Sequence, residues 1–78
     1  MRKVVYFEWR DAAGRDGWIP ATPEALPPTA LVKSIGWVLN ETKDTITITS
    51  GWEPLQDGAM GAISVPKAWI KKRRYVKV

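Results

Sequence analysis

Basic side chains gather at the C-terminal end of this 78-residue chain, and two aromatic residues lie among them. Residues 67–78 carry six lysines and arginines and no acid, whereas residues 1–66 carry six basic groups against eight acids. Cations bind phosphates and aromatic rings stack on bases, so this block has the composition of a site for RNA or single-stranded DNA. The candidate residues are Lys67, Trp69, Lys71, Lys72, Arg73, Arg74 and Tyr75.

The same basic block has a second interpretation, which the sequence leaves open. Lysines on the outermost strand of a sheet discourage other strands from pairing with it. A run of like charges is also typical of a solvated face. The block is therefore either a phosphate-binding surface or the protection of a sheet edge.

A second candidate site lies in residues 50–61, where three glycines and a proline predict a long exposed loop. An exposed tryptophan in a loop is a typical anchor for a protein partner. We expect Trp52 to be more exposed than Trp69, and we expect Trp9, Trp18 and Trp37 to fill the core. The candidate partner-binding residues are Trp52, Leu55 and Met60.

Catalysis, metal binding and cofactor binding are not expected from this composition. The chain has no cysteine and no histidine, which removes thiolate nucleophiles, imidazole bases, disulfides and ordinary zinc sites. Its serines have no neighbouring base to activate them. Asp11 and Asp16 flank glycines in an expected turn, and Glu53 and Asp57 share the expected loop, as is typical of residues that cap turns. The sequence therefore predicts a binding protein without catalytic residues, metal or cofactor.

The N-terminus and the absence of cysteine bear on where the protein acts. Only four apolar residues lie between Lys3 and Glu8, far short of the roughly 7 to 15 of a secretory signal. No uncharged stretch approaches the roughly 18 residues of a membrane helix. Small secreted domains usually rely on disulfides. We therefore expect a cytoplasmic protein that does not associate with membranes.

Apolar residues alternate with a period of two along most of the chain, which predicts a mostly β fold. Val5, Phe7 and Trp9 share one face of the first expected strand. Isoleucines alternate with threonines in the third. The five expected strands cover residues 3–9, about 31–40, 45–49, 62–65 and a last segment ending near Val78.

The connections between these strands are marked by turn residues. Residues 11–17 contain two glycines and two aspartates and predict a turn. Thr22 followed by Pro23 predicts a short helical turn, which Pro27 and Pro28 end. Gly36 allows a bend in the second strand. Pro66 ends the fourth strand, and residues 68–70 form a tight turn into the last one.

These elements predict one domain over residues 1–78. Five short, strongly bent strands with a tight turn between the last two are typical of a small, partly open five-stranded barrel of the SH3-like or Sm-like kind. Here a short helical turn follows strand one. Closure of such a barrel hides most strand edges.

A resemblance to known proteins runs through nearly the whole chain. It rests on residues 8–12, Gly17–Trp18, residues 35–39 and residues 65–67, which read EWRDA, GW, IGWVL and VPK. In this order they resemble a family of small uncharacterised bacteriophage and prophage proteins. The resemblance implies a phage origin, action in the host cytoplasm, and a host or virion protein as the partner of the second candidate site. It implies no activity.

The hairpin over residues 35–49 is similar to the first Sm motif, with Gly36 and Leu39 at its glycine and leucine. Residues 65–70 resemble the second motif. The RNA-binding positions depart from the family, because a threonine replaces the asparagine and Pro66–Lys67 replaces the Arg-Gly pair. The resemblance implies a homo-oligomer, a ring joined through the edges of the last two strands. A structural phage component whose oligomer is its function is a further alternative.

Overall fold

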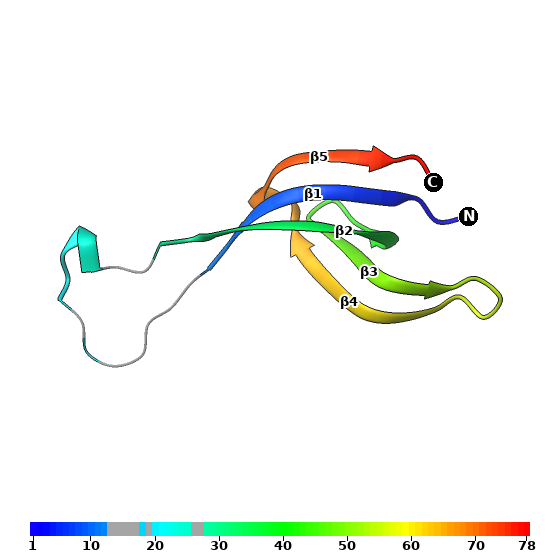
Figure 1. Cartoon of the computed structure of the whole chain (residues 1–78), viewed down its shortest axis with the longest axis horizontal. Coiled ribbons are helices and arrows are strands. Elements are labelled where there is room, and N and C mark those ends of the chain that lie inside the picture. Colours follow the sequence, from blue (N-terminus) through cyan, green and yellow to red (C-terminus); the bar gives the residue numbers. More distant parts are fainter. Residues whose placement is uncertain (13–17, 19, 26–27) are drawn as a thin grey trace.

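Five antiparallel strands form one sheet in the order β4-β3-β2-β1-β5 (Figure 1). The computed structural model describes residues 1–12, 18, 20–25 and 28–78. The predicted all-β fold, with five strands in this chain order, is confirmed. The elements are β1 (Val4–Asp11), the 3₁₀ turn η1 (Pro23–Ala25), β2 (Ala30–Glu41), β3 (Thr45–Glu53), β4 (Gly58–Pro66), the 3₁₀ turn η2 (Lys67–Trp69) and β5 (Ile70–Val76).

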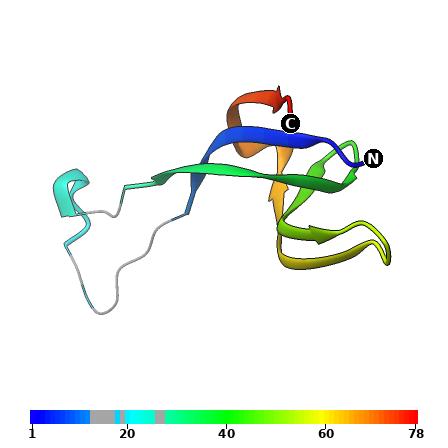
Figure 2. The ribbon, with the colours of Figure 1, turned by 45° about the vertical axis from the view of Figure 1, so that its right-hand side comes forward.

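The sheet bends strongly but does not close, so the expectation that closure hides most strand edges is wrong. The pairing of β2 with β3 shifts register between Val38 and Asn40, and β3 and β4 fold beneath β1 and β2 (Figure 2). The turn η2 then carries the chain from β4 at one edge to β5 at the other. Because β4 and β5 flank the sheet, no strand of the described part of the chain pairs with the outer edge of either.

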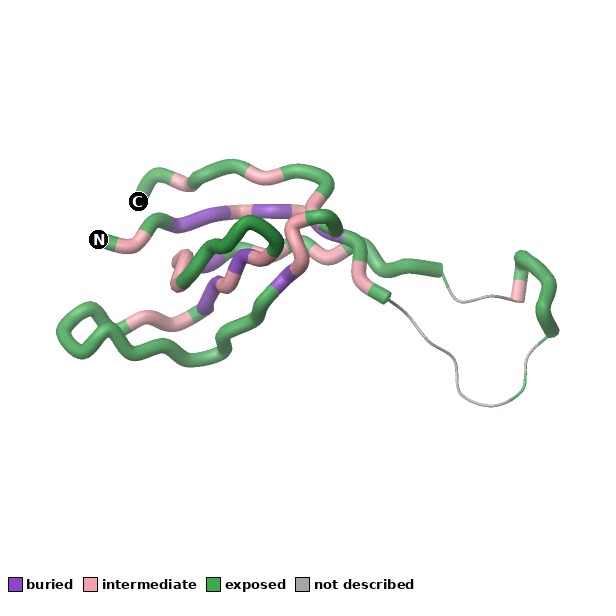
Figure 3. The backbone as a smooth tube through the Cα atoms, turned by 180° about the vertical axis from the view of Figure 1, so that it is seen from behind, coloured by how far each residue is buried: buried purple, intermediate pink, exposed green. Residues whose placement is uncertain are grey.

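The core lies on the concave side of this bent sheet. Val5, Phe7 and Trp9 come from β1, and Ile46 and Ile48 come from β3 (Figure 3). Val65 of β4 completes the buried cluster, and Val32, Val38 and Ile70 pack against it. The alternation of the sequence predicted these β1 and β3 residues, and the expected core position of Trp9 is confirmed. The expected core position of Trp37 is wrong, because this residue is half-buried and lies outside the cluster.

Gly36 lies where β2 passes close to β3. A Cβ atom at this position would lie 2.5 Å from the backbone oxygen of Thr49. No side chain fits at that distance, so only glycine permits the approach. The glycine therefore serves close packing between the strands as well as the predicted bend.

The predicted loop over residues 50–61 is wrong, because most of it is a regular β-hairpin. Strands β3 and β4 pair from Thr45↔Pro66 to Glu53↔Gly58, and the turn covers only residues 54–57. Asp57 provides the left-handed turn position with φ 54°. The glycines that indicated a loop lie within the strands, where Gly61 has φ 71°.

The segment between β1 and β2 is described in part. The short helical turn is confirmed as η1, where the amide of Ala25 donates to the carbonyl of Thr22 at 2.9 Å. Most of the turn predicted over residues 11–17 lies outside the described residues. Trp18 is fully exposed. The expected core role of Trp18 is therefore wrong, because this residue lies beyond the end of β1, away from the concave side of the sheet.

Candidate nucleic-acid interface

Strands β2, β1 and β5 form a three-stranded layer with two different faces. Successive side chains of a strand point to opposite faces, and directly paired residues share a face. Phe7 points into the core, so its neighbours Tyr6 and Glu8 point outward. Pairing then places three rows of side chains on the outer face. The rows are Trp37–Val4–Val76, Ile35–Tyr6–Arg74 and Lys33–Glu8–Lys72.

The third row sets one carboxylate between two lysines. The tyrosine hydroxyl of Tyr6 donates a hydrogen bond of 2.5 Å to Glu8. This hydrogen bond, with smaller contributions from the charges of Lys33 and Lys72, lowers the pKa of Glu8. Glu8 is therefore ionised at neutral pH and carries the one negative charge of this row, between Lys33 and Lys72.

The second row combines an aromatic ring with a cation. The guanidinium carbon of Arg74 lies 5.5 Å from the centre of the Tyr6 ring. This geometry is a cation–π contact. We call Lys33, Lys72 and Arg74 the cationic cluster; all three side chains are exposed. Arg10, two residues beyond Glu8, continues the same face.

Two of the predicted site residues are instead engaged with Glu41 at the end of β2. Lys67 lies 2.7 Å and Arg73 3.1 Å from its carboxylate. Hydrogen bonds from Lys67 and Arg73 lower the pKa of Glu41. Arg73 also donates to the hydroxyl of Tyr75 at 2.8 Å. These two cations join β5 and η2 to β2, so the basic block is divided between a structural bridge and the outer face.

The other predicted aromatic residue, Trp69, stacks on Trp9 with ring centres 6.2 Å apart and an angle of 16°. Its side chain is 41% exposed and covers the buried Trp9. Lys71 is exposed and lies at the irregular pairing of β1 with β5, between the pairs Glu8↔Lys72 and Trp9↔Ile70. The structure brings Lys72 and Arg74 together on the outer face and places Trp69 beside the core.

Trp52 does not project from a loop; it contacts Arg2 near the N-terminus, Asp57 in the hairpin turn and Trp37 of β2. Its indole donates to Asp57 at 2.6 Å, and Arg2 donates two hydrogen bonds to the same carboxylate. Trp37 packs against it with ring centres 6.4 Å apart. The expectation that Trp52 is more exposed than Trp69 is wrong, because Trp52 is half-buried while Trp69 is exposed.

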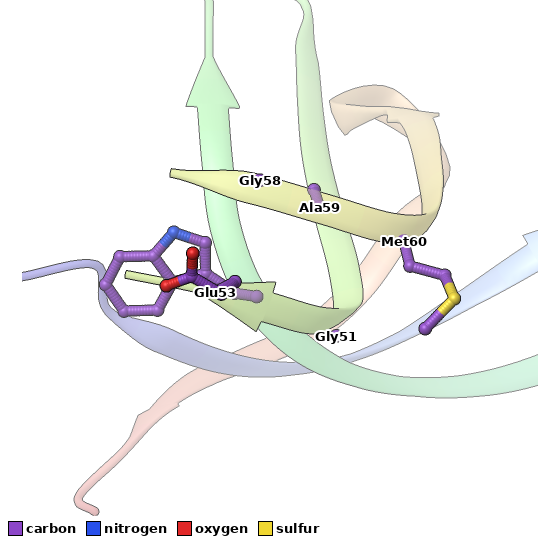
Figure 4. A pocket seen from close by; sticks show the side chains of 6 residues that line it. Gly51, Glu53, Gly58, Ala59 and Met60 are labelled. Atoms are coloured by element: carbon purple, nitrogen blue, oxygen red, sulfur yellow. The ribbon is translucent and has the colours of Figure 1, made fainter. Parts of the chain in front are cut away.

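The other two partner-binding candidates are exposed on the hairpin. Leu55 in the turn is 95% exposed and Met60 of β4 is 75% exposed. Figure 4 shows Met60 and Glu53 toward opposite ends of an open hollow that Trp52 also lines. These residues remain candidates for contact with another protein.

Two carboxylates at strand ends accept hydrogen bonds from nearby backbone amides, whereas the carboxylate of Asp57 binds Arg2 and Trp52 and caps no turn that the structure describes. Asp11 accepts a hydrogen bond from the amide of Ala12, and Glu53 accepts from the amides of Leu55 and Gln56. Among the described residues, no group of three histidine, cysteine, aspartate or glutamate side chains is placed to hold a metal ion.

Tyr6, Glu8 and Lys33 are the residues of this face that the sequence did not single out. They come from strands far from the basic block, and only the register of β1 with β2 and β5 brings them to it. The sequence does indicate that Tyr6 and Glu8 lie on the outward face of their strand, because they alternate with the core residues.

No family model, curated protein or solved structure matches this chain. None of the helices in the described part of the chain is long and apolar enough to span a membrane.

Proposed function

We propose that the outer face of strands β2, β1 and β5 binds single-stranded nucleic acid, without catalysis. The observation that carries the proposal is the cationic cluster around Tyr6, in which Lys33 and Arg74 come from opposite neighbours of β1. Three exposed cations face one carboxylate there, so the cluster has an excess of positive charge. Such a surface attracts phosphates.

A rigid sheet supports this binding better than a flexible tail does. Lys33, Lys72 and Arg74 extend from paired strands, so their backbones are fixed before a ligand arrives. Preorganised side chains lose less conformational freedom on binding. Contacts to phosphates determine position and carry no base sequence. We therefore propose binding with little sequence preference.

The preference for a single strand rests on Tyr6 and Arg74. Unpaired bases stack on aromatic rings and on the plane of an arginine guanidinium. The contact between these two side chains provides both surfaces beside the lysines. Bases of a duplex are stacked on each other and do not reach such a platform.

The test is fluorescence anisotropy with labelled single-stranded RNA, single-stranded DNA and duplex DNA. The double variant Lys72→Gln, Arg74→Gln should bind the single strands about tenfold more weakly at low salt. The control Lys43→Gln, Lys77→Gln removes the same charge from exposed positions outside the cluster and should bind nearly as the parent does. Arg73 is left unchanged because its pairing with Glu41 stabilises the fold. Equal weakening by both variants contradicts the proposal.

The strand order also supports assignment of the bent sheet to the small SH3-like or Sm-like barrels. Two observed features carry this assignment: β1 pairs with both β2 and β5, and a 3₁₀ turn separates β4 from β5. A phage origin and action in the host cytoplasm are further parts of the proposal, carried by the sequence resemblance alone.

A second candidate function is protein binding through the β3–β4 hairpin. It is favoured by the exposure of Leu55 and Met60. Replacement of both by serine should abolish capture of a host or virion protein and leave nucleic-acid binding unchanged. The two candidate functions are therefore separable by variants on different strands.

A further inference from the structure

Strand β4 is an open sheet edge with no charged residue. Its nine residues read GAMGAISVP, and positions 58–64 are exposed. Exposed edges offer backbone donors and acceptors to another strand, and proteins usually protect them with charge or proline. The proline of β4 stands at its last position, so most of the strand lacks either protection.

The opposite edge is protected in the usual way. Strand β5 has four consecutive cations, Lys71 to Arg74. Pairing of β5 with another β5 would set like charges against each other. The contrast between the two edges points to β4 as the edge that is kept free for pairing.

We propose that β4 pairs antiparallel with β4 of a second copy of this chain about a two-fold axis. Full overlap sets Gly58 opposite Pro66 and sets Ala62 opposite itself. Asp57, just before the strand, then lies across from Lys67, just after it, in the other copy; each of them also has an ion pair within its own chain, with Arg2 and Glu41 respectively. Parallel pairing would instead set each of these charges beside its own copy.

The side chains of β4 fit this arrangement. Met60 is 75% exposed and Ile63 is 43% exposed, so both have apolar surface to bury against a partner. The central residues Gly61 and Ala62 are small and allow the strands to approach. Within the strand, from Gly58 to Pro66, the two-fold pairing therefore covers neutral side chains only.

Pairing of β4 with β5 of another copy is less favourable on these observations. This pairing would restrict the four long cationic side chains of β5 beside β4, which has no acidic residue to pair with them. Ordering long charged side chains without a partner costs free energy. This alternative builds rings or open chains, whereas the two-fold contact stops at a dimer.

Oxidative cross-linking tests the register directly, because the natural chain has no cysteine. In the proposed dimer the two Ala62 Cα atoms lie about 4.5 to 5.5 Å apart, within disulfide reach. Ala62→Cys should form a covalent dimer in high yield. The control Ala68→Cys is also exposed but lies in η2 and should form little. Equal yields overturn the proposal, as does preferential linkage in a mixture of Ala62→Cys and Lys72→Cys chains.

A second measurement does not depend on cysteine. Sedimentation of the parent protein should show a species of twice the chain mass that dissociates on dilution. Ile63→Lys should reduce it to the monomer with an unchanged circular dichroism spectrum, and Ala68→Lys should not. A parent protein that stays monomeric at high concentration, or forms larger assemblies, overturns the proposal. If Ile63→Lys unfolds, the cysteine result decides.

Discussion

Replacement of Gly36 by alanine tests the close packing of β2 on β3. The added Cβ would lie 2.5 Å from the oxygen and 3.1 Å from the carbon of the Thr49 carbonyl. It would also lie 3.4 Å from a terminal carbon of Ile48. Because the two nearest atoms belong to the backbone, a side-chain rotation cannot relieve the clash and β3 must shift.

The cost follows from two opposing effects. Inserting a carbon into a packed site costs about 1–3 kcal/mol. Loss of glycine's extra freedom in the unfolded chain returns about 0.5–1 kcal/mol. A contact of 2.5 Å with a backbone atom places the insertion cost near the upper limit of about 3 kcal/mol, so the variant should be less stable by about 2–2.5 kcal/mol. This lowers the melting temperature of a domain this size by roughly 8–20 °C.

Thermal unfolding followed by circular dichroism measures this change. The matched control is Gly58→Ala, where nothing lies within 4 Å of the added Cβ and φ is not left-handed. The control should unfold within about 0.5 kcal/mol of the parent. A Gly36→Ala variant as stable as the parent would refute the packing argument, as would equal losses in both variants.

Three further predictions concern the carboxylates. Glu8→Gln removes the anion between Lys33 and Lys72. A single-stranded oligonucleotide should therefore bind about two- to fivefold more tightly in anisotropy titrations. Weaker binding would contradict the proposal that this face binds nucleic acid. Glu41→Gln breaks the ion pairs from β2 to Lys67 and Arg73, and urea unfolding should show a free energy of unfolding lower by about 1 kcal/mol. An unchanged free energy of unfolding would show that these ion pairs do not stabilise the fold. Hydrogen bonds from Arg2 and Trp52 lower the pKa of Asp57 from 3.8 to about 2, so its contribution to stability is present at neutral pH and is lost as pH falls from about 4 to about 2. The unfolding midpoint should fall over that range in the parent and less in Asp57→Asn; identical profiles contradict the pairing.

The strand pattern was predictable where one face of a strand is buried. Val5, Phe7 and Trp9 alternate with polar or outward residues, and that alternation is a local property of the sequence. The same holds for Ile46 and Ile48. Each of these five residues lies in the core as the pattern requires.

The hairpin of β3 and β4 was not predictable in this way. Gly51, Gly58 and Gly61 are typical of loops when read locally. In the fold they lie in strands, and Gly61 uses its left-handed φ inside β4. Trp52 is covered because Arg2 and Trp37 come to it from other parts of the chain, which no local pattern shows.

The positive charge of the candidate site was predictable from the sequence, but the set of residues that form the site was not. The basic block was visible in the sequence, yet Arg73 and Lys67 are occupied by Glu41. Lys33 joins Lys72 and Arg74 only through the register of three strands. Such register depends on contacts between distant residues, so composition alone could not separate structural cations from exposed ones.

The salt dependence of binding tests the central claim most directly. Three phosphate contacts on a single strand predict a slope of about −2 for log affinity against log salt, or roughly a 20-fold loss between about 50 and about 200 mM. The triple variant Lys33→Gln, Lys72→Gln, Arg74→Gln should bind weakly with a slope near zero. A flat profile for the parent protein, or a slope unchanged in the triple variant, would contradict a nucleic-acid interface on this face.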